Sequence, residues 1–510
     1  MEKRKKLIIL GVTLLVLVIS GITYAILTWT SSKINIGLTS NCFTIDYTKG
    51  QDITNQGIKL INEEDLINDG KFTIKDGIAL TYANIGIKST CTIEGYGILK
   101  LNVTSLSDAF TTGNSKGSLK YAVLKNTSSS NTITVDNLKD QSFDLVARGS
   151  ITKLGTIDIL TEQLSNTEIY KYLIVVYIDN NLVGNDVIGS SFTGNISAEA
   201  YQGKLSFTDT ITSSFSTTSI VTNNSIDYEY DTTHNLMKDI GGNIRYYGAE
   251  PNNYIYFNCS DYSNQSSSTC ETWRIIGVFD GKLKLIRGSQ IGGLAWDQDK
   301  NDDLSKTTYD NDWSTATLQK LLNGSYYNGI GSVTYYNSST TETTLDMTSI
   351  GIKNDVTRGL ISETIYYLGG WDDSSVYPNQ IYEYERGTKV YTGRPTTWQG
   401  KIALPYPSDY GYAADLGKCL NKQLNSYNDS TCTSNNWMKP IFAIYYNWLL
   451  TPDFNKPNYV MGIISMGWVY VNSNSLVFQP CGVAPVLYLD SELSIKSGTG
   501  SSSEPYQLDV

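Results

Sequence analysis

The single histidine of the chain, His234, limits the acid–base and metal chemistry that the sequence offers. A Ser-His-Asp or Cys-His hydrolase needs a general base beside its nucleophile, and histidine usually fills that role. His234 follows Asp231, Thr232 and Thr233 in a stretch with few apolar residues. We therefore interpret it as a surface side chain, and the sequence argues against an enzyme with a histidine-based site.

Carboxylate chemistry remains open, because a glycosidase needs only two Asp or Glu side chains that flank the scissile bond. In the segment YEYER, Glu383 and Glu385 would lie on the same side of an extended strand. Two like charges placed so closely raise one pKa, as an acid catalyst requires. Asp409 and Asp415 are further candidates, and a solvated acidic surface is the alternative for all four residues.

Calcium is the one metal that the spacing of oxygen ligands suggests. Four such side chains recur at every second position: Asp297, Asp299, Asn301 and Asp303. EF-hand loops begin with this spacing. Asp302 replaces the loop glycine, however, and Thr308 stands where the bidentate glutamate belongs. A solvated loop is therefore the competing interpretation, and no other cofactor is predicted.

Tryptophans are concentrated in the second half of the chain, where eight of the nine follow residue 270. Flat aromatic faces beside hydrogen-bonding side chains can stack on sugar rings or anchor a protein partner. Trp371, followed by Asp372 and Asp373, and Trp398 lie in turn-rich segments. We predict a ligand site at these four residues, with burial of the tryptophans in a core as the alternative.

An export signal precedes all of these residues. Residues 1–6 carry four basic side chains, and an almost continuous apolar run extends from Leu7 to Leu27. About 20 apolar residues allow a helix to cross a bilayer, with the basic cluster in the cytoplasm. A signal peptide cleaved near Ala25 has nearly the same pattern. The sequence thus predicts either a single-pass membrane protein with an extracellular C-terminal part, or a secreted protein.

Seven cysteines in an exported chain favour disulfides over a metal site. The chain contains no C-x-x-C spacing, which makes zinc an unfavourable interpretation. Local pairing joins neighbours in the sequence and leaves Cys481 single. The predicted pairs are Cys42–Cys91, Cys259–Cys270 and Cys419–Cys432.

Composition and charge narrow the class of partner. The net charge is −11, and the only basic run is the N-terminal one. Sequence-independent binding of nucleic acid needs a basic face, so the sequence excludes this class of partner. The apolar fraction is 40% and the charged fraction only 17%, which is typical of β-rich extracellular domains.

Changes of composition divide the chain into five segments, and the fold class is mainly β. The segments are a basic stub with a transmembrane or signal helix (1–30), a β-sandwich (31–203), a Ser/Thr-rich linker (204–235), an α+β domain with short helices and long loops (236–495) and a tail with an edge strand (496–510).

Three segments carry the clearest predictions of local structure. Asp280-Gly281 separates two alternating apolar runs and predicts a β-hairpin. Tyr170–Asp179 is apolar enough to be a buried strand. Ser362–Leu368, which precedes two glycines, is predicted as a short helix.

Two parts of the chain resemble known families. Residues 1–205 resemble camelysin/TasA-like exported β-sandwich proteins of Gram-positive bacteria, through the segments GITYA, LINEEDL, FTIKD and FTGNISAEAYQ. Residues 236–510 resemble uncharacterised surface domains of gut Firmicutes, through IRYYGAEPNNYIYFNC, WRIIGVF, NDWSTATLQKLLNGSYYN, LPYPSDYGYA, WLLTP and APVLYLDS. The first resemblance implies a surface protein or a biofilm fibre subunit, and the second implies exposure at the cell surface without an established activity.

The sequence supports three hypotheses about function. The leading one is a non-enzymatic surface protein that displays its distal domain for adhesion or ligand binding, with a glycan or a host or bacterial surface protein as partner. The second is a structural fibre subunit of a biofilm matrix. The third is a carbohydrate-active enzyme that uses a carboxylate pair.

Overall fold

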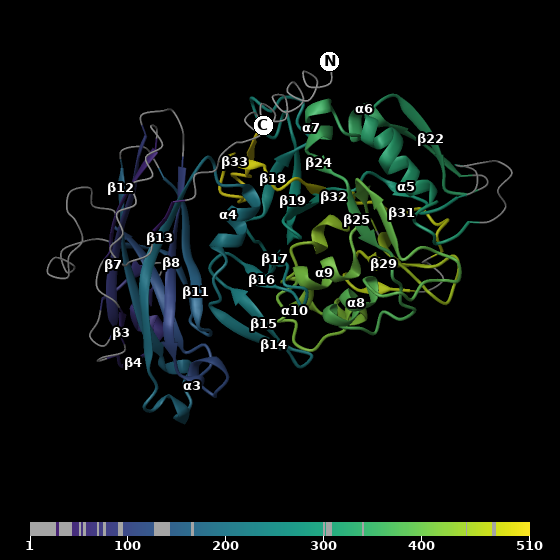
Figure 1. Cartoon of the computed structure of the whole chain (residues 1–510). Helices are drawn as coiled ribbons and strands as arrows, with labels where there is room; N and C mark the ends of the chain where they lie inside the picture. Colours follow the sequence, from purple (N-terminus) through teal and green to yellow (C-terminus); the bar gives the residue numbers. More distant parts are fainter. Residues whose placement is uncertain are drawn as a thin grey trace, which may run out of the picture. The chain divides into compact units, whose positions relative to one another are not determined.

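The computed structural model describes residues 27–29, 43–49, 53–54, 58–68, 71–74, 78–89, 95–126, 143–164, 168–298, 301, 309–338, 341–444, 446–471 and 476–510. These residues are mainly β, with short helices between the strands (Figure 1). The chain divides into two compact units, Met1–Leu205 and Ser206–Val510.

Two predictions for the N-terminal part fall outside the described residues. These are the transmembrane or signal helix and the pairing of Cys42 with Cys91. Within the described part of the chain, every helix is too short or too polar to cross a bilayer.

The first unit is built from two sheets. The strand order of the first sheet is β1 (Leu27–Trp29), β13 (Phe192–Gln202), β8 (Gly95–Leu106) and β11 (Gly155–Leu164), with β3 (Ile53–Thr54) paired to β13. The order of the second is β2 (Phe43–Lys49), β7 (Ala79–Ser89), β12 (Ile169–Asp179), β9 (Leu119–Asn126), β10 (Phe143–Ser150), β6 (Lys71–Phe72) and β5 (Ile67–Asn68), with β4 (Leu60–Ile61) paired to β12. Short helical segments join them: α2 (Glu63–Leu66), α3 (Asp108–Thr111), η2 (Asn180–Leu182) and η3 (Asn185–Val187).

The two sheets share one core, as in a β-sandwich. In β8 every second residue from Gly95 to Val103 is buried, because successive side chains of a strand point to opposite faces. Strand β12 is covered on both faces. Ile174 and Val176 belong to the core between the sheets, whereas Leu173 and Val175 pack into a second cluster with α2. The prediction of a buried strand at Tyr170–Asp179 is confirmed.

The second unit is centred on a ten-stranded sheet. Its main order is β14 (Ser219–Asn223), β15 (Ile226–Asp231), β16 (Leu236–Lys238), β17 (Ile244–Tyr246), β19 (Glu271–Phe279), β20 (Lys282–Arg287), β32 (Val486–Leu489) and β24 (Ile361–Ser362); β18 (Tyr254–Phe257) pairs with β19, and β27 (Ile402–Ala403) with β32. A second sheet has the order β21 (Gly293–Leu294), β31 (Cys481–Gly482), β28 (Tyr446–Pro452), β29 (Val460–Ile464) and β30 (Val469–Tyr470).

Three two-stranded ribbons and a set of short helices complete this unit. The ribbons are β22 (Ser332–Tyr336) with β23 (Glu342–Asp346), β25 (Thr364–Tyr367) with β26 (Thr397–Gly400), and β33 (Ser494–Ser497) with β34 (Gln507–Asp509). The helices are α4 (Phe207–Ser214), α5 (Thr317–Leu321) continued by η5 (Leu322–Tyr326), α6 (Met347–Ile350), α7 (Asp355–Leu360), α8 (Pro378–Glu385), α9 (Pro407–Ala413), η6 (Leu424–Ser426), α10 (Ser430–Thr433) and η7 (Lys439–Ile441).

Several local predictions are confirmed in the second unit. The predicted hairpin forms as β19–β20 and turns at Asp280 and Gly281, whose positive φ angles of 49° and 74° are typical of two-residue hairpin turns. Disulfides join Cys259 to Cys270 and Cys419 to Cys432, and Cys481 is free and buried. The C-terminal tail returns as β34 and pairs with β33.

The predicted linker at 204–235 is wrong, because residues from Ser206 onward fold as part of the second unit. The Ser206 hydroxyl accepts the backbone N–H of Asp209 and caps α4, which buries Phe207 and Ile211 one helical turn apart. The next segment forms β14 and β15. Few apolar residues are enough here because Phe207 and Ile211 in α4, and Tyr228 and Tyr230 in β15, stand at the period of their elements and are buried.

The predicted helix at Ser362–Leu368 is also wrong. Ser362 ends β24, and Thr364–Tyr367 forms β25. β24 pairs with β32 and β25 with β26, so tertiary pairing decides the conformation of a segment whose local signals are weak.

Candidate functional site

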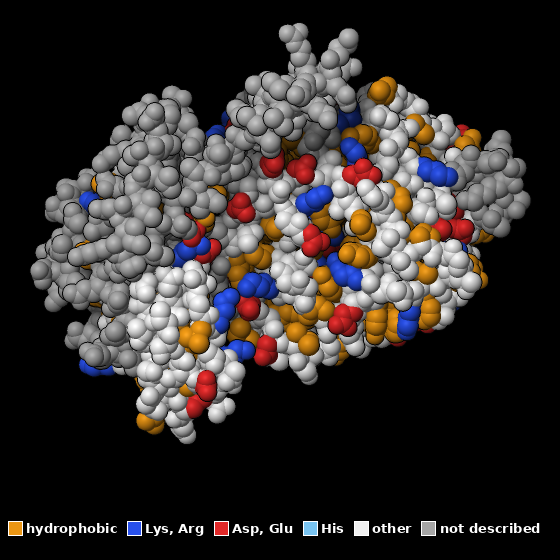
Figure 2. Space-filling view, viewed as in Figure 1, with side chains coloured by type: hydrophobic (Ala, Val, Ile, Leu, Met, Phe, Trp, Pro, Cys, Tyr) orange, Lys and Arg blue, Asp and Glu red, His pale blue; other side chains and the backbone are white. Residues whose placement is uncertain are grey.

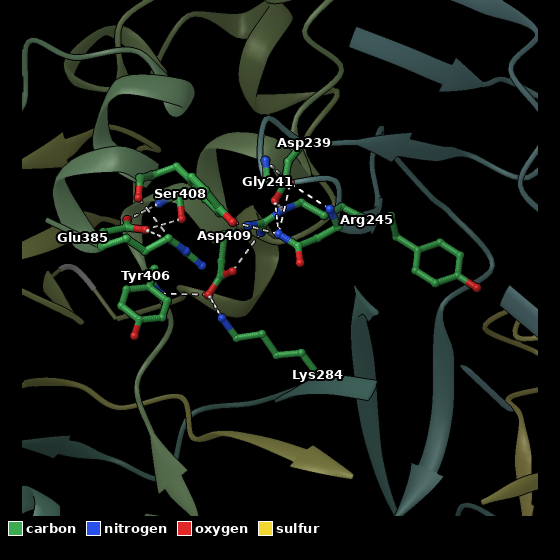
Figure 3. A network of polar contacts seen from close by, with 12 residues as sticks. Asp239, Gly241, Arg245, Lys284, Glu385, Tyr406, Ser408 and Asp409 are labelled. Carbon is green, nitrogen blue, oxygen red and sulfur yellow. Dashed lines mark hydrogen bonds and ion pairs between the residues drawn. The ribbon is translucent and has the colours of Figure 1, made fainter. Parts of the chain in front are cut away.

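A buried network of charged side chains lies within the second unit and joins four elements. Asp239 follows β16, Arg245 is on β17, Lys284 on β20 and Asp409 on α9 (Figure 3). The KLKLI segment of β20 alternates, so Lys284 faces away from its apolar neighbours Leu283 and Leu285. The pairing of β20 with its neighbouring strands therefore places the Lys284 ammonium group in the interior of the unit.

Asp409 is the centre of this network. Its Oδ1 accepts a hydrogen bond from Arg245 Nη1 at 2.9 Å, and its Oδ2 accepts one from Lys284 Nζ at 2.6 Å. The backbone N–H of Tyr406 also donates to Oδ2, which closes a capping box at the start of α9. Burial opposes ionisation of Asp409, but Lys284 and Arg245 outweigh it and lower the pKa of the carboxyl group.

Asp239 holds the other side of Arg245. Its Oδ2 accepts Arg245 Nε at 2.6 Å, and its Oδ1 accepts the backbone N–H groups of Gly241 and Asn243. The guanidinium also lies 4.5 Å from the centre of the Phe279 ring. Burial disfavours the charge of Arg245, but the two carboxylates outweigh this effect and raise its pKa.

Glu385 extends the network, because its carboxyl group interacts with that of Asp409, and burial moves the pKa values of Glu385 and Lys284 towards neutrality. Glu385, at the end of α8, accepts the backbone N–H of Ser408 at 2.9 Å and the Ser408 hydroxyl at 2.5 Å, and Arg386 Nη1 lies 3.2 Å from it. Burial raises the pKa of Glu385 to about 7, although Arg386 and Ser408 oppose the change. Burial also lowers the pKa of Lys284 to about 8, against the attraction of Asp409.

A pocket of about 210 Å³ lies against this network, and we call it the tyrosine pocket. Its walls carry the aromatic residues Tyr367, Tyr382, Tyr406, Tyr488 and Phe279 and the polar residues Asn243, Asp280, Lys282 and Arg386. Several of these residues also bond to the network. Asn243 bonds Asp239 and donates to the Tyr382 hydroxyl at 2.9 Å, and Arg386 bonds Glu385 while its guanidinium stacks 3.5 Å from the centre of the Tyr382 ring.

The network therefore fixes the walls of the tyrosine pocket and does not itself line it. Lys284 and Glu385 are completely buried, whereas Tyr367 is 37% exposed. A ligand in the pocket would meet aromatic rings, hydroxyl groups, an amide and a guanidinium. Groups of this kind bind polar ring compounds. Bonds to the buried network hold Asn243 and Arg386 in position before a ligand binds.

The predicted pair of Glu383 and Glu385 is wrong as a strand pair. Both residues lie in α8, where positions two apart point to opposite sides of the helix. Glu383 is exposed and Glu385 is completely buried. The carboxylate that lies near Glu385 and adds to the rise of its pKa belongs to Asp409 and not to Glu383. Asp415 accepts the backbone N–H of Gly417.

The predicted ligand residues Trp371 and Trp398 pack into separate aromatic groups. Tyr384 stacks on Trp371 with ring centres 3.8 Å apart, and Lys389 Nζ lies 4.3 Å from the same ring centre. Since Tyr384 occupies one face, Lys389 covers the other. Trp398 packs against Trp313 and Tyr366. Both tryptophans therefore make aromatic contacts within the second unit, and neither lines the tyrosine pocket.

The acidic neighbours of Trp371 are exposed. Asp372 accepts a hydrogen bond from the Asn455 amide, and Asp373 accepts the backbone N–H of Ser375. These contacts fix loops, and neither aspartate lines the tyrosine pocket.

The two described members of the predicted calcium loop bond to the protein backbone. Asp297 is completely buried and accepts the N–H groups of Asp310 and Thr317, the second of which is the first residue of α5. The Asn301 amide exchanges two 2.7 Å hydrogen bonds with the backbone of Tyr336. Asp299 and Asp303 lie outside the described residues, and within those described no group of three metal-ligating side chains is found.

His234 lies beside Asp231, which holds together the start of the second unit. Its Nδ1 is 2.7 Å from Asp231 Oδ2, and the same carboxylate accepts the N–H of Ser216. Asp231 is completely buried, whereas the His234 side chain is 37% exposed. The contact gives His234 a structural role at a turn.

Sequence reasoning missed most of the network and the pocket. Asp239, Arg245 and Lys284 come from three strands or their ends, and no short motif joins them to Asp409. One local signal was present, since Pro407 and Asp409 stand at the first and third positions of α9, where proline and a capping carboxylate are favoured.

Comparison of the chain with protein-family models gives no match, and comparison with curated proteins gives no significant match.

Proposed function

We propose that the protein is an exported cell-surface protein whose second unit binds a carbohydrate ligand in the tyrosine pocket. The observation that carries this proposal is the combination of four tyrosines and Arg386 around one pocket whose walls are held by a buried charge network. Membrane attachment through the N-terminal apolar segment, or secretion after cleavage near Ala25, belongs to the same proposal.

The disulfide bonds of the second unit support the proposal that the protein is exported. Its two disulfides are typical of proteins that fold in oxidising compartments. The basic N-terminal residues and the apolar run that follows supply the corresponding signal.

The size and chemistry of the pocket support a sugar as ligand. A volume of about 210 Å³ is below the roughly 300–1,000 Å³ of sites for drug-sized molecules, which favours one sugar ring of a larger glycan. Tyrosine rings provide apolar faces, and Asn243, Asp280 and Arg386 provide hydrogen-bonding groups for hydroxyls.

The surface of the second unit supports the same class of partner. In the face shown in Figure 2, acidic and basic side chains are interspersed over the described surface. A mixed surface of this kind suits a largely neutral polymer, and the net charge of −11 disfavours nucleic acid.

A glycan and mucin array probed with the full chain in mild detergent tests this proposal. Tyr367→Ala is the most selective variant. The backbone N–H and carbonyl group of Tyr367 form its hydrogen bonds with the Tyr406 hydroxyl, so the substitution removes the ring and leaves these bonds in place. We expect binding to weaken about tenfold, as for the loss of one well-placed aromatic contact.

Tyr336→Ala is the matched control, since Tyr336 is a partly exposed tyrosine on another two-stranded ribbon, away from the pocket. It is expected to keep the binding of the wild-type protein. Equal binding by the wild-type protein and Tyr367→Ala, or no saturable binding to any glycan, would remove the tyrosine pocket as a carbohydrate site.

A further inference from the structure

A second pocket of about 490 Å³ lies elsewhere in the second unit, and we call it the arginine pocket. Its wall includes Tyr254, Glu271, Arg274, Arg287 and Trp437. The disulfide of Cys270 holds one side of it, and the backbone of Gly288 bonds to Thr272 on another. The pocket is therefore bounded by the sheet, by one loop that a disulfide fixes and by one backbone hydrogen bond.

The two arginines of this pocket differ in how they are bonded. Arg287 pairs with Glu271 through Nε and Nη2, both at 3.0 Å, and its Nη1 donates to the carbonyl groups of Ser289 and Gln290. All three of its nitrogens thus have protein acceptors. Arg287 is a structural member of the wall.

Arg274 has a cationic group with almost no partners. It is 6% exposed, and its one hydrogen bond runs from Nε to Asn253 Oδ1 at 2.6 Å. Nη2 is buried without a partner, and among the described residues neither Nη atom has a protein acceptor. The guanidinium stacks 3.5 Å from the centre of the Tyr254 ring and 4.9 Å from that of Trp437.

No carboxylate of the described residues forms an ion pair with Arg274. Glu250 acts on it only from a distance, because its carboxylate bonds the Tyr254 hydroxyl. Burial lowers the pKa of Arg274 to about 10, so the group is still a cation at neutral pH. Folding has to offset the cost of a desolvated charge that no protein group neutralises.

We propose that the arginine pocket binds a small molecule that carries one carboxylate, and that Arg274 Nη1 is the donor that holds it. Nη1 is the free donor atom of Arg274 that is not itself buried, so a ligand in the pocket reaches it. Nη1 carries two N–H donors and part of the positive charge, so a carboxylate oxygen bonded to it forms a charge-assisted hydrogen bond.

The charge of the pocket favours a carboxylate over a phosphate. Among the residues that line the pocket, Arg274 and Arg287 contribute two positive charges and Glu271 one negative charge, which leaves one positive charge that Glu250 only weakens from a distance. A monoanion balances this charge completely, whereas a phosphate dianion leaves an excess. The pocket volume falls within the usual range for small-molecule sites.

Calorimetric titration of the full chain in mild detergent tests the proposal with four probes at equal ionic strength. The probes are acetate, glucuronate, glucose as the neutral counterpart of glucuronate, and inorganic phosphate. We expect binding of acetate and tighter binding of glucuronate, with weaker binding of phosphate and none of glucose at this pocket. Arg274→Gln should weaken the binding of glucuronate at least tenfold.

The matched control is Arg358→Gln, an arginine on α7 that pairs with Asp355 away from the pocket and should leave binding unchanged. Arg274→Met separates binding from folding. Without a ligand, its melting temperature should equal or exceed that of the wild-type protein, because an unpaired buried charge is removed.

Three results would overturn the proposal. These are unchanged binding of glucuronate by Arg274→Gln, equal weakening of glucose and glucuronate binding by Arg274→Gln, and absence of binding by both acetate and glucuronate. A marked fall in the melting temperature of ligand-free Arg274→Met would also count against it, because Arg274 would then be a structural residue. Loss of sugar binding at the tyrosine pocket would leave this proposal standing, since the two sites share no residue.

Discussion

The substitution Asp409→Asn is expected to lower the free energy of unfolding of the second unit by about 3–5 kcal/mol. Asp409 is the carboxylate that both Arg245 and Lys284 contact, and all three side chains are almost completely buried. A neutral amide leaves Lys284 buried without an opposite charge, and removing one partner of a buried pair is costly for this reason. Arg245 keeps Asp239 as a partner.

Urea denaturation followed by tryptophan fluorescence measures this effect selectively, because eight of the nine tryptophans lie in the second unit. Asp415→Asn is the matched control on the same segment. Its carboxylate accepts the N–H of Gly417, and Lys418 lies 3.9 Å away at the surface, so the expected cost is below about 1 kcal/mol. Similar costs for the two variants would show that the network does not stabilise the fold.

Stability of the second unit is expected to fall between about pH 4.5 and pH 7 because of Glu385. The folded protein raises the pKa of Glu385 from 4.5 to about 7, so the folded state binds this proton more tightly than the unfolded chain. The resulting stabilisation is complete below pH 4.5 and is lost as the pH rises through 7. One pKa unit corresponds to about 1.4 kcal/mol, which gives a total change of about 3 kcal/mol.

Lys284 has the opposite effect at higher pH. Burial lowers its pKa from 10.5 to about 8, so the folded state binds this proton less tightly than the unfolded chain. The contribution of Lys284 to the stability of the fold is therefore complete above pH 10.5 and is lost as the pH falls through 8. Together the two groups place a minimum of stability between about pH 7 and pH 8.

Urea midpoints at pH 5, 7.5 and 10 test this pH dependence. Glu385→Gln should abolish the fall between pH 5 and 7.5, since its amide does not ionise. Glu383→Gln, an exposed position on the same helix, should retain the fall. A flat profile for the wild-type protein, or an unchanged profile for Glu385→Gln, would contradict the assignment of this titration to Glu385.

Elements with a strong local pattern were predictable from the sequence. The hairpin β19–β20 combines alternation with an Asp-Gly turn, and β12 is a continuous apolar run bounded by polar turns. The disulfides of the second unit join cysteines 11 and 13 residues apart, so local pairing found them. In each case the information lies within about 20 residues.

Elements that depend on distant partners were not predictable. Thr364–Tyr367 pairs with β26, which follows only after α8 in the sequence, and the two glycines after Leu368 indicated the end of a helix instead. The same limit applies to the site. Arg245 and Asp409 are 164 positions apart and form one ion pair, so only the sheet topology brings them together. The contacts of Trp371 with Tyr384 and Lys389 were not predictable either, because these residues come from the following helix and loop.

A crystal structure of the full chain with its tightest glycan from the array is the most direct test of the proposed function. The prediction is that one sugar ring lies among Tyr367, Tyr382 and Tyr406, with a hydroxyl or carboxylate bonded to Arg386, and that Lys284 and Asp409 keep their ion pair. A glycan bound at any other surface, with the tyrosine pocket empty, would contradict the account.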